Sequence, residues 1–224
     1  LRDVQKPVSG TVGRPFPGYR IKLKNELGAE LPLVAGSKGT LWVHSNQLLL
    51  GYYKRPELNA VIFDKDGFFD TGDIMVLTAN GDLMFAGRSK ETIALAGGEN
   101  IEPVPIEDKL LASEFIDQVM VVGDDRKTLG AIIVPNFEKV RNHAGIKGIP
   151  ESQWNENAQV REIFKNEISQ RISAKTGFKS FELIPKNIFY LVPRQFEIGQ
   201  ELTRTYKLRR TVIKDMYQNE IDSM

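Results

Sequence analysis

The stretch from Gly87 to Pro103 divides the chain into two parts of different character. In it, a basic, polar run leads into a short apolar run that ends in a glycine pair, and an acid, an amide and a proline follow. Turn residues crowd the sequence before it, whereas apolar side chains at helical spacing recur after it. Because 224 residues are enough for two modest domains, we predict an α+β fold with a β-rich part over residues 1–88, a second part over residues 89–224, and a hinge between them.

Short strands and turns are expected throughout the first part. The expected strands are residues 19–24, 41–44, 74–77 and 83–86. Asn80-Gly81 lies between the last two and is a strong hairpin signal. Pro56 suits the first turn of a short helix over residues 54–60. We therefore predict that this part is β-rich and folds as a small barrel.

The second part is expected to be a sheet covered by helices. Two apolar segments, residues 118–123 and 129–135, flank the polar run 124–127, which predicts a hairpin. Apolar side chains recur at helical spacing over residues 160–172. The other expected elements are helices at residues 105–111, 137–144 and 206–224, a strand at residues 187–191 and a loop over residues 145–157. This order predicts a small α+β layer.

The composition excludes several kinds of site. The chain has no cysteine, which excludes disulfides and cysteine nucleophiles, and His44 and His143 are too few for a histidine metal site. A formal net charge of +1 gives no bulk argument for nucleic acid or membrane. No apolar run is long enough to span a bilayer, and nothing at the start resembles a signal peptide. We therefore predict a cytoplasmic protein with no metal site, no nucleic-acid partner and no transmembrane segment; peripheral membrane association stays open.

Three charged positions suit a nucleotide or a phosphate, and each also has an ordinary structural interpretation. Asp73 precedes an apolar strand, where its carboxylate can accept two ribose hydroxyls or bond its own backbone in a turn. Arg88 ends the predicted hairpin, where it can hold a ribose or phosphate oxygen or serve as a surface cation. Lys207 can reach a phosphate and a carboxylate together as a mobile point charge, or belong to a solvated basic face. Taken singly, the local sequence favours the structural interpretation of each.

The glycine pair Gly97-Gly98 lets backbone approach a thin ligand, because no Cβ intervenes. Glu99 and Asn100 add an acceptor and an amide. In isolation, an ordinary turn between a strand and a helix is the favoured interpretation. The chain contains neither Gly-x-x-x-x-Gly-Lys-[Ser/Thr] nor Gly-x-Gly-x-x-Gly, so neither of these phosphate-binding loops is predicted.

Five motifs in one order decide more than each does alone. They are residues 51–57, 67–73, 87–93, 97–103 and the lysine segment 202–210. Together they resemble the carboxy-terminal part of the adenylate-forming enzymes, a superfamily of acyl-CoA synthetases, adenylation domains and luciferases. The resemblance covers essentially the whole chain. Within the superfamily, residues 96–107, 177–182 and 202–210 look most like long-chain fatty acyl-CoA synthetases.

The resemblance implies a two-step reaction that begins with adenylation. A fatty carboxylate attacks the α-phosphate of ATP, accompanied by Mg²⁺, to give acyl-adenylate and pyrophosphate. Asp73 resembles the acid that holds the ribose hydroxyls, and Arg88 resembles the arginine that also contacts the ribose. Lys207 resembles the lysine that bridges the substrate carboxylate and ATP.

In the implied second step, the thiol of CoA attacks the acyl carbon and AMP leaves. Gly97, Gly98 and Glu99 match the loop that approaches the pantetheine tunnel in the thioester-forming state. Lys90 matches the hinge position, about which a small domain rotates to exchange Lys207 for the glycine loop. The implied partners are thus a fatty acid, ATP and CoA.

Several features of the resembled family are missing from the 224 residues. They are the amino-terminal phosphate loop, the glutamate associated with Mg²⁺ and most of the acyl pocket; Lys38-Gly39-Thr40 also stands where a Gly-Glu pair is more usual. The chain starts at Leu1 rather than methionine. We therefore expect a fragment of a long-chain fatty acid–CoA ligase, namely the β-rich end of the large adenylation domain followed by the small mobile carboxy-terminal domain. The isolated fragment is expected to lack catalysis.

Three alternatives stay open. One is an enzyme of the same superfamily that loads acyl groups onto acyl carrier protein, for which the acidic carrier would meet a basic surface formed by Lys175, Lys179, Arg204, Arg209 and Arg210. The second is a noncatalytic nucleotide-binding or interaction module. The third is a nucleic-acid binder, which predicts salt-sensitive binding and which the near-neutral charge disfavours.

Overall fold

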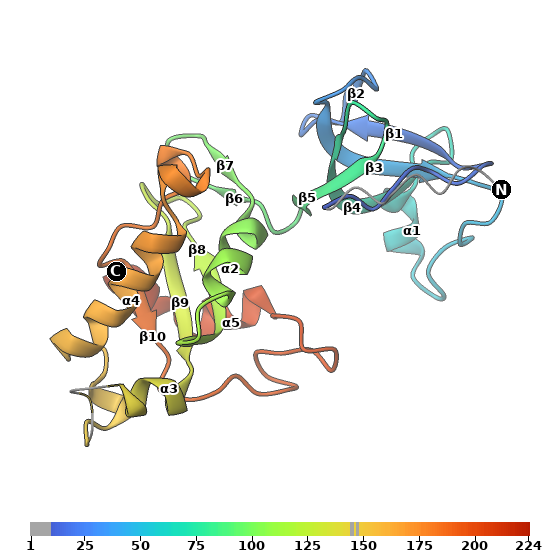
Figure 1. Ribbon diagram of the computed structural model, residues 1–224. Coiled ribbons are helices and arrows are strands. Elements are labelled where there is room, and N and C mark those ends of the chain that lie inside the picture. Colours follow the sequence, from blue (N-terminus) through green and yellow to red (C-terminus); the bar gives the residue numbers. More distant parts are fainter. Residues whose placement is uncertain (1–9, 144–145, 147) are drawn as a thin grey trace. The chain divides into compact units, whose positions relative to one another are not determined.

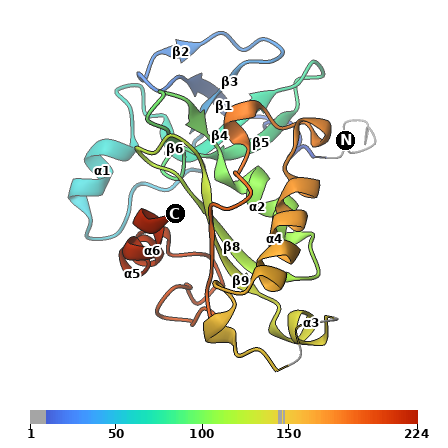
Figure 2. The same cartoon turned by 90° about the vertical axis from the view of Figure 1, so that its left-hand side faces the viewer.

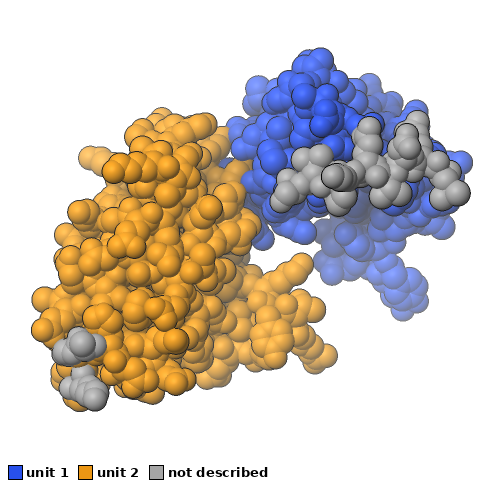
Figure 3. Space-filling view, in the orientation of Figure 1, with its two compact units in different colours: residues 1–92 blue, residues 93–224 orange. Residues whose placement is uncertain are grey.

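The computed structural model describes residues 10–143, 146 and 148–224, and the chain forms two compact units, Leu1–Thr92 and Ile93–Met224 (Figure 3). Each unit has its own buried apolar side chains. The chain passes from unit 1 to unit 2 within the stretch from Gly87 to Pro103. The domain boundary between residues 88 and 89 stays a prediction.

Unit 1 is built on a five-stranded antiparallel sheet in the order β2-β1-β3-β4-β5 (Figure 1). Its elements are β1 (Arg20–Lys24), β2 (Glu30–Leu31), β3 (Lys38–His44), the helix α1 (Pro56–Ile62), β4 (Phe69–Leu77) and β5 (Leu83–Arg88). The Asn80-Gly81 turn connects β4 to β5, as the sequence predicts. The core of this unit consists of Leu23, Leu41, Met75, Leu77 and Leu83.

The prediction of a small barrel is wrong, because the sheet in the described part of unit 1, residues 10–92, is open. β2 at one edge has two residues, too few to pair with a distant strand. At the other edge, Leu83 of β5 exchanges backbone hydrogen bonds with the segment before β1: the N–H of Val12 donates to its carbonyl, and its own N–H donates to Gly13 O, both at 2.8 Å. Alternating, turn-rich sequence indicates paired strands, but closure depends on which edges meet.

Gly39 of β3 lies where the neighbouring strand β1 leaves no room for a side chain. A Cβ at this position would lie 2.6 Å from the carbonyl oxygen of Lys24 on the neighbouring strand β1. Any side chain would therefore push β1 and β3 apart. The glycine in Lys38-Gly39-Thr40 thus has a structural role in the sheet.

Asp64 joins the turn before β4 to β1. Its Oδ2 accepts a hydrogen bond from Lys24 Nζ at 2.8 Å, and its Oδ1 accepts from the N–H groups of Asp66 at 3.0 Å and Phe68 at 2.9 Å. Burial by itself raises the pKa of Asp64, but the hydrogen bonds from Lys24 and the two N–H groups outweigh it and lower the pKa from 3.8 to about 2. Lys24 Nζ also lies 3.6 Å from the centre of the Trp42 ring, so the ion pair is part of the packing of unit 1.

Unit 2 contains a three-stranded sheet in the order β10-β9-β8 and a small hairpin of β6 and β7. Its elements are β6 (Ile93–Ala94), β7 (Asn100–Ile101), α2 (Pro103–Leu111), β8 (Ile116–Val122), β9 (Gly130–Pro135), α3 (Phe137–Asn142), α4 (Ala158–Arg171), β10 (Phe189–Leu191), α5 (Arg210–Met216), α6 (Gln218–Ser223), and short 3-10 turns at Glu151–Gln153, Ala174–Thr176 and Ser180–Glu182. β8 and β9 are antiparallel, whereas β10 runs parallel to β9.

The three-stranded sheet is buried on both faces. Val119 and Val121 of β8 enter one apolar cluster, and Met120 and Val122 enter another. Figure 2 shows α2 and α4 on one side of the sheet, and α5 and α6 on the other. Because successive side chains of a strand point to opposite faces, a strand covered on both sides must be apolar throughout. This explains the two uninterrupted apolar segments of the sequence.

The predicted terminal helix over residues 206–224 is split into α5 and α6. The break is at Tyr217, whose buried ring packs 6.0 Å from that of Tyr190 and 6.3 Å from that of Phe196. Of the predicted helix 137–144 and loop 145–157, residues 144, 145 and 147 lie outside the described residues.

No helix in the described part of the chain has the length and apolar character needed to cross a membrane.

The Asp64–Lys24 pair makes the stability of unit 1 depend on pH. Since the pKa of Asp64 is lower in the folded state, the pair stabilises unit 1 above about pH 4 and this contribution is lost as the pH falls toward about 2. Asp64→Asn is expected to lower the unfolding free energy of unit 1 by roughly 1.5–3 kcal/mol at pH 7. In this variant the unfolding free energy should also fall less steeply as the pH is lowered from about 4 to about 2. Urea titrations followed by the indole N–H resonances of Trp42, in unit 1, and Trp154, in unit 2, measure this.

Asp66→Asn is the matched control, because Asp66 is half exposed and its ion pair with Lys22 is open to solvent. Equal effects of the two substitutions, or an effect at Trp154 rather than Trp42, would contradict the assignment.

Candidate functional site

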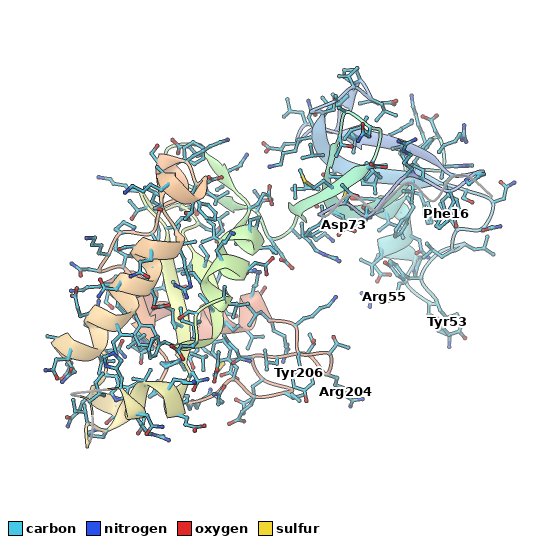
Figure 4. The ribbon with its side chains drawn as sticks, viewed as in Figure 1. Phe16, Tyr53, Arg55, Asp73, Arg204 and Tyr206 are labelled. Carbon is cyan, nitrogen blue, oxygen red and sulfur yellow. The ribbon has the colours of Figure 1, made fainter. Side chains whose placement is uncertain are left out.

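Asp73 and Arg88 face each other across β4 and β5, where they are register partners. Arg88 Nε lies 3.2 Å from Asp73 Oδ1, and the two side chains keep 48% and 25% of their surfaces exposed. The contact is not aligned as a hydrogen bond, so Oδ1 has no hydrogen-bond partner among the described residues. A carboxylate and a guanidinium with unused hydrogen-bonding capacity thus lie side by side at one end of the sheet. Figure 4 marks Asp73.

Asp70 and Thr71, rather than Asp73, bond the backbone of the turn before Asp73. Asp70 Oδ1 accepts from the N–H of Gly72 at 2.9 Å, and Thr71 Oγ1 accepts from the N–H of Asp73 at 3.1 Å. The Thr71 hydroxyl also donates to Leu41 O on β3 at 2.8 Å. These two side chains hold the backbone of the segment, which leaves the carboxylate of Asp73 facing Arg88.

Lys90 lies in the turn that follows β5. The N–H groups of Glu91 and Thr92 both donate to the carbonyl of Arg88, at 2.9 and 3.2 Å. Before the turn, Ser89 N–H donates to Gly72 O at 2.9 Å, which fixes the end of β5 to β4. The Lys90 side chain is exposed and makes no hydrogen bond or ion pair with any described residue. Its position suits a connection between the units, and its role as a hinge stays a prediction.

Gly97, Gly98 and Glu99 form the tip of the β6–β7 hairpin. Leu95 N–H donates to Glu99 O, and Gly98 N–H donates to Leu95 O, both at 2.9 Å. Gly98 has a φ of +90°, which favours glycine, and a Cβ on Gly97 would lie 2.4 Å from Glu99 Oε2. The glycines therefore serve the turn itself, and they also leave exposed backbone at its tip.

The β6–β7 hairpin is fixed to the large sheet of unit 2 through the loop between β8 and β9. Ala96 N–H donates to Arg126 O, and Asp125 N–H donates to Ala94 O, both at 2.9 Å. The glycine tip is thus held at the end of the sheet where the loop between β8 and β9 lies.

Lys207 lies in a second small hairpin, within the segment that connects β10 to α5. Thr203 N–H donates to Lys207 O at 2.8 Å, and Lys207 N–H donates to Thr203 Oγ1 at 3.0 Å. The ammonium group is exposed and has no hydrogen-bond or ion-pair partner among the described residues. Figure 4 marks Arg204 and Tyr206 at the end of this segment. The side chain of Lys207 thus has no partner among the described residues, whereas hydrogen bonds hold the backbone from which it projects. Its role in adenylation stays a prediction.

Glu201 was not singled out from the sequence, although it is fully buried below the Lys207 hairpin. Its carboxylate accepts hydrogen bonds from Arg194 and, at 3.0 Å, from the N–H of Glu197. Burial by itself raises the pKa of Glu201, but these hydrogen bonds outweigh it and lower the pKa below its ordinary value. No local pattern separates Glu201 from the polar neighbours Glu197 and Gln200, so the sequence carries no signal for it.

The predicted basic surface is only partly available. Arg209 donates to the carbonyls of Gly199 and Gln200 at 2.7 and 2.8 Å. Arg210 forms a two-bond ion pair with Glu107 of α2, and Glu107 is buried and also accepts from the N–H of Val121 at 2.7 Å. Both arginines therefore have partners within the fold, although Arg209 is exposed, as are Lys175, Lys179 and Arg204.

The candidate residues fall into three places. Asp73 and Arg88 are together in unit 1. Within unit 2, Figures 1 and 2 place the β6–β7 hairpin and the segment between β10 and α5 at different ends of the sheet. The described residues contain no group of three or more histidine or acidic side chains that could hold a metal ion.

Comparison with protein families identifies the class. The family described as "AMP-binding enzyme C-terminal domain" matches residues 90–224. The chain therefore belongs to the AMP-binding, adenylate-forming enzymes, as the five motifs predict, and represents their carboxy-terminal portion.

Three relatives show the range of the class. The chain is 35% identical to the probable acyl-activating enzyme 16, chloroplastic, and 33% identical to the long-chain-fatty-acid–[acyl-carrier-protein] ligase AEE15, chloroplastic, both of Arabidopsis thaliana; all of the chain is covered, with 32% and 30% of these proteins. It is 33% identical to human long-chain-fatty-acid–CoA ligase 1, over 96% of the chain and 31% of that protein. The chain thus spans about a third of the length of these relatives.

Solved structures show the same fold. The adenylation domain of the carboxylic acid reductase from Segniliparus rugosus, in complex with AMP and a carboxylic acid, superposes with a TM-score of 0.74 at 25% identity, over 91% of this chain and 31% of that one. The mixed α+β architecture is therefore that of the carboxy-terminal part of adenylation domains.

Tyr206 tests how firmly the Lys207 hairpin is built. It has a φ of +60°, a left-handed conformation that costs a non-glycine residue roughly 1–2 kcal/mol, and the residue is 71% exposed. Tyr206→Gly should therefore leave hydrogen exchange at the Thr203 and Lys207 amides unchanged or slower, whereas the β-branched Tyr206→Val should make it faster. Asn, which tolerates this conformation, serves as the control and should resemble Gly. Faster exchange in the Gly variant than in the Val variant would contradict the assignment.

Proposed function

We propose that this chain is part of an AMP-forming ligase that activates a long-chain fatty acid with ATP and transfers the acyl group to CoA. Membership of the AMP-binding enzymes supports the reaction class. The relatives with long-chain fatty acids in their names support the substrate class. Because the chain spans about a third of these relatives, the activity belongs to a protein that also includes the phosphate loop and acyl pocket of the family.

The observation that carries the proposal is the state of Lys207. Its backbone is fixed by hydrogen bonds on both sides of a hairpin, yet its ammonium group is exposed and unpaired among the described residues. A cation that projects from a fixed backbone without a partner can bind an anionic ligand. In adenylation two anions must meet, and a positive charge between them reduces their repulsion and stabilises charge in the transition state.

In the first step, the fatty carboxylate oxygen bonds to the α-phosphorus of ATP and pyrophosphate leaves. We assign Lys207 to the carboxylate and the phosphate, and Asp73 and Arg88 to the ribose. Oδ1 of Asp73 is buried against Arg88, so the exposed quarter of the Asp73 side chain and the half-exposed guanidinium of Arg88 are the parts that suit a diol, which both donates and accepts hydrogen bonds. Mg²⁺ supplies charge neutralisation to ATP, and its protein ligands are assigned to the rest of the enzyme.

In the second step, the thiol sulfur bonds to the acyl carbon, the bond from that carbon to the adenylate oxygen breaks, and AMP leaves. We assign the exposed glycine tip, Gly97 and Gly98 with Glu99, to the thiol arm. Within unit 2 the β6–β7 hairpin and the segment between β10 and α5, which carries Lys207, lie at different ends of the sheet, so one orientation of the unit presents one group and another orientation presents the other. Lys90 is the proposed hinge for that exchange.

Acyl carrier protein is a second candidate acceptor, because a relative at 33% identity is named as an acyl-carrier-protein ligase. Lys175, Lys179 and Arg204 are the exposed cations that suit an acidic carrier. Competition between CoA and carrier protein for the acyl-adenylate of the full-length enzyme distinguishes the two acceptors. A cytoplasmic location stays a prediction, and two of the relatives are named as chloroplastic.

Lys207→Ala in the full-length enzyme tests the first step. Acyl-adenylate formation, followed by pyrophosphate release, should fall roughly 100- to 1,000-fold, as for the loss of one transition-state donor. Thioester formation from preformed acyl-adenylate should change little. Lys186→Ala is the control, since Lys186 is another exposed lysine of unit 2 without a partner among the described residues. Equal loss of both half-reactions would count against the assigned role.

Lys90→Pro tests the hinge. Proline at the third position of the Arg88–Glu91 turn fixes its own φ and restricts the backbone of Ser89 before it, which stiffens the connection. One half-reaction should slow selectively, whereas Lys90→Ala, which leaves the backbone free to turn, should retain both. If the proline variant keeps both rates unchanged, Lys90 is not the hinge.

A further inference from the structure

Glu201 is the most thoroughly buried charged side chain in the described residues, with 0% of its surface exposed. Buried carboxylates are costly unless they are paired and hydrogen-bonded. Glu201 has both kinds of partner, since Arg194 forms an ion pair with one carboxylate oxygen and the N–H of Glu197 donates to the other at 3.0 Å. The pair lies close to Tyr217 of one apolar cluster and within the segment that connects β10 to α5.

The side chain and the backbone of Glu201 contact different parts of the segment between β10 and α5. Its side chain holds Arg194 and Glu197, which come just after β10, and its backbone carbonyl accepts from the N–H of Arg209 at 2.8 Å, just before α5. The Lys207 hairpin lies between these contacts. The backbone of Glu201 therefore closes the base of the hairpin, and its side chain fixes that base to the residues that follow β10.

The hairpin continues directly from this closure. Leu202, which is buried, pairs with Leu208, and Thr203 then pairs with Lys207. The beginning of the segment is also fixed to the sheet, because Gln195 Nε2 donates to Asp117 Oδ2 at 2.9 Å. A continuous set of contacts thus runs from β8 through Arg194 and Glu201 to the backbone of Lys207.

We infer that Glu201, together with Arg194, is a positioning residue for Lys207 in the adenylation step. This inference rests on the proposed function of Lys207, but the physical claim concerns the hairpin alone. Lys207 lacks a partner that would orient its ammonium group, so the backbone from which it projects sets its reach. An ion pair with one fully buried partner is suited to this task, because the buried carboxylate accepts its hydrogen bonds in a defined geometry. A catalytic group displaced by about 1 Å can lose roughly 100-fold in rate.

The first test uses the 224-residue chain and needs no activity. Glu201→Gln keeps the size of the side chain and its acceptor oxygen but removes the charge that holds Arg194. Amide hydrogen exchange at Thr203, Lys207 and Arg209 should become at least about tenfold faster, while the amides of β8 and β9 keep their wild-type rates. Arg194→Gln, at a side chain that is 39% exposed, should have the same effect and guards against a folding defect of the Glu201 variant. Unchanged exchange at these three amides in a folded variant would overturn the inference.

The second test uses the full-length enzyme and its two half-reactions. Glu201→Gln and Arg194→Gln should each slow acyl-adenylate formation about 10- to 100-fold and leave thioester formation from preformed acyl-adenylate unchanged. The double variant should be no slower than either single variant, because both remove the same pair. Glu167→Gln is the matched control: it disrupts another partly buried acid–arginine pair of unit 2, with Arg171 at 3.0 Å, and should leave both half-reactions unchanged.

The outcomes separate this inference from the proposed function. If the wild-type enzyme forms no acyl-adenylate, the proposed function fails, and the exchange measurements alone decide whether Glu201 fixes the hairpin. If Lys207→Ala abolishes adenylation but Glu201→Gln and Arg194→Gln retain it, the positioning role is wrong while the function of Lys207 stands. Equal slowing of both half-reactions by Glu201→Gln would show a general structural role and overturn the inference as well.

Discussion

The burial of β8 and β9 on both faces is the constraint on which unit 2 depends. Helices cover each side of this sheet, and alternate side chains of the two strands enter separate apolar clusters. A sheet enclosed in this way cannot carry polar chemistry on its faces, because an unpaired polar group there would lose its water. Chemistry is therefore left to the ends of the strands and the segments that leave them, which is where the glycine tip and Lys207 lie.

The glycine tip and the lysine are fixed by different means. The β6–β7 hairpin is held by backbone hydrogen bonds to the loop between β8 and β9, and its glycines satisfy the turn itself. The Lys207 hairpin is held by ion pairs on either side of it. Arg194 pairs with Glu201 before the hairpin, and Glu107 pairs with Arg210 after it, at the start of α5. Two rigid supports on one small unit suit a reaction in which that unit presents two different groups in turn.

Rigid support and unused bonding capacity occur together at the proposed ligand groups. Thr71 and Asp70 hold the backbone around Asp73, and a hairpin holds that of Lys207, yet neither Oδ1 of Asp73 nor the ammonium group of Lys207 has a hydrogen-bond partner among the described residues. By contrast, Arg209 and Arg210, which have the same charge in the sequence, are fully engaged within the fold. Charge alone therefore does not show which cations of this segment are engaged within the fold.

The sequence by itself determined the class of protein and most of the elements. Five ordered motifs indicated the family, the apolar segments at 118–123 and 129–135 are strands because they are buried on both faces, and Asn80-Gly81 makes a hairpin because its residues favour that turn. Local patterns of this kind act over a few residues. Tertiary structure decided the open sheet of unit 1, the pairing of Asp73 with Arg88 and the burial of Glu201, because each depends on groups brought together from separate segments. Glu201 is the clearest case: the free energy of burying a carboxylate depends on where Arg194 lies, and no local pattern records that position.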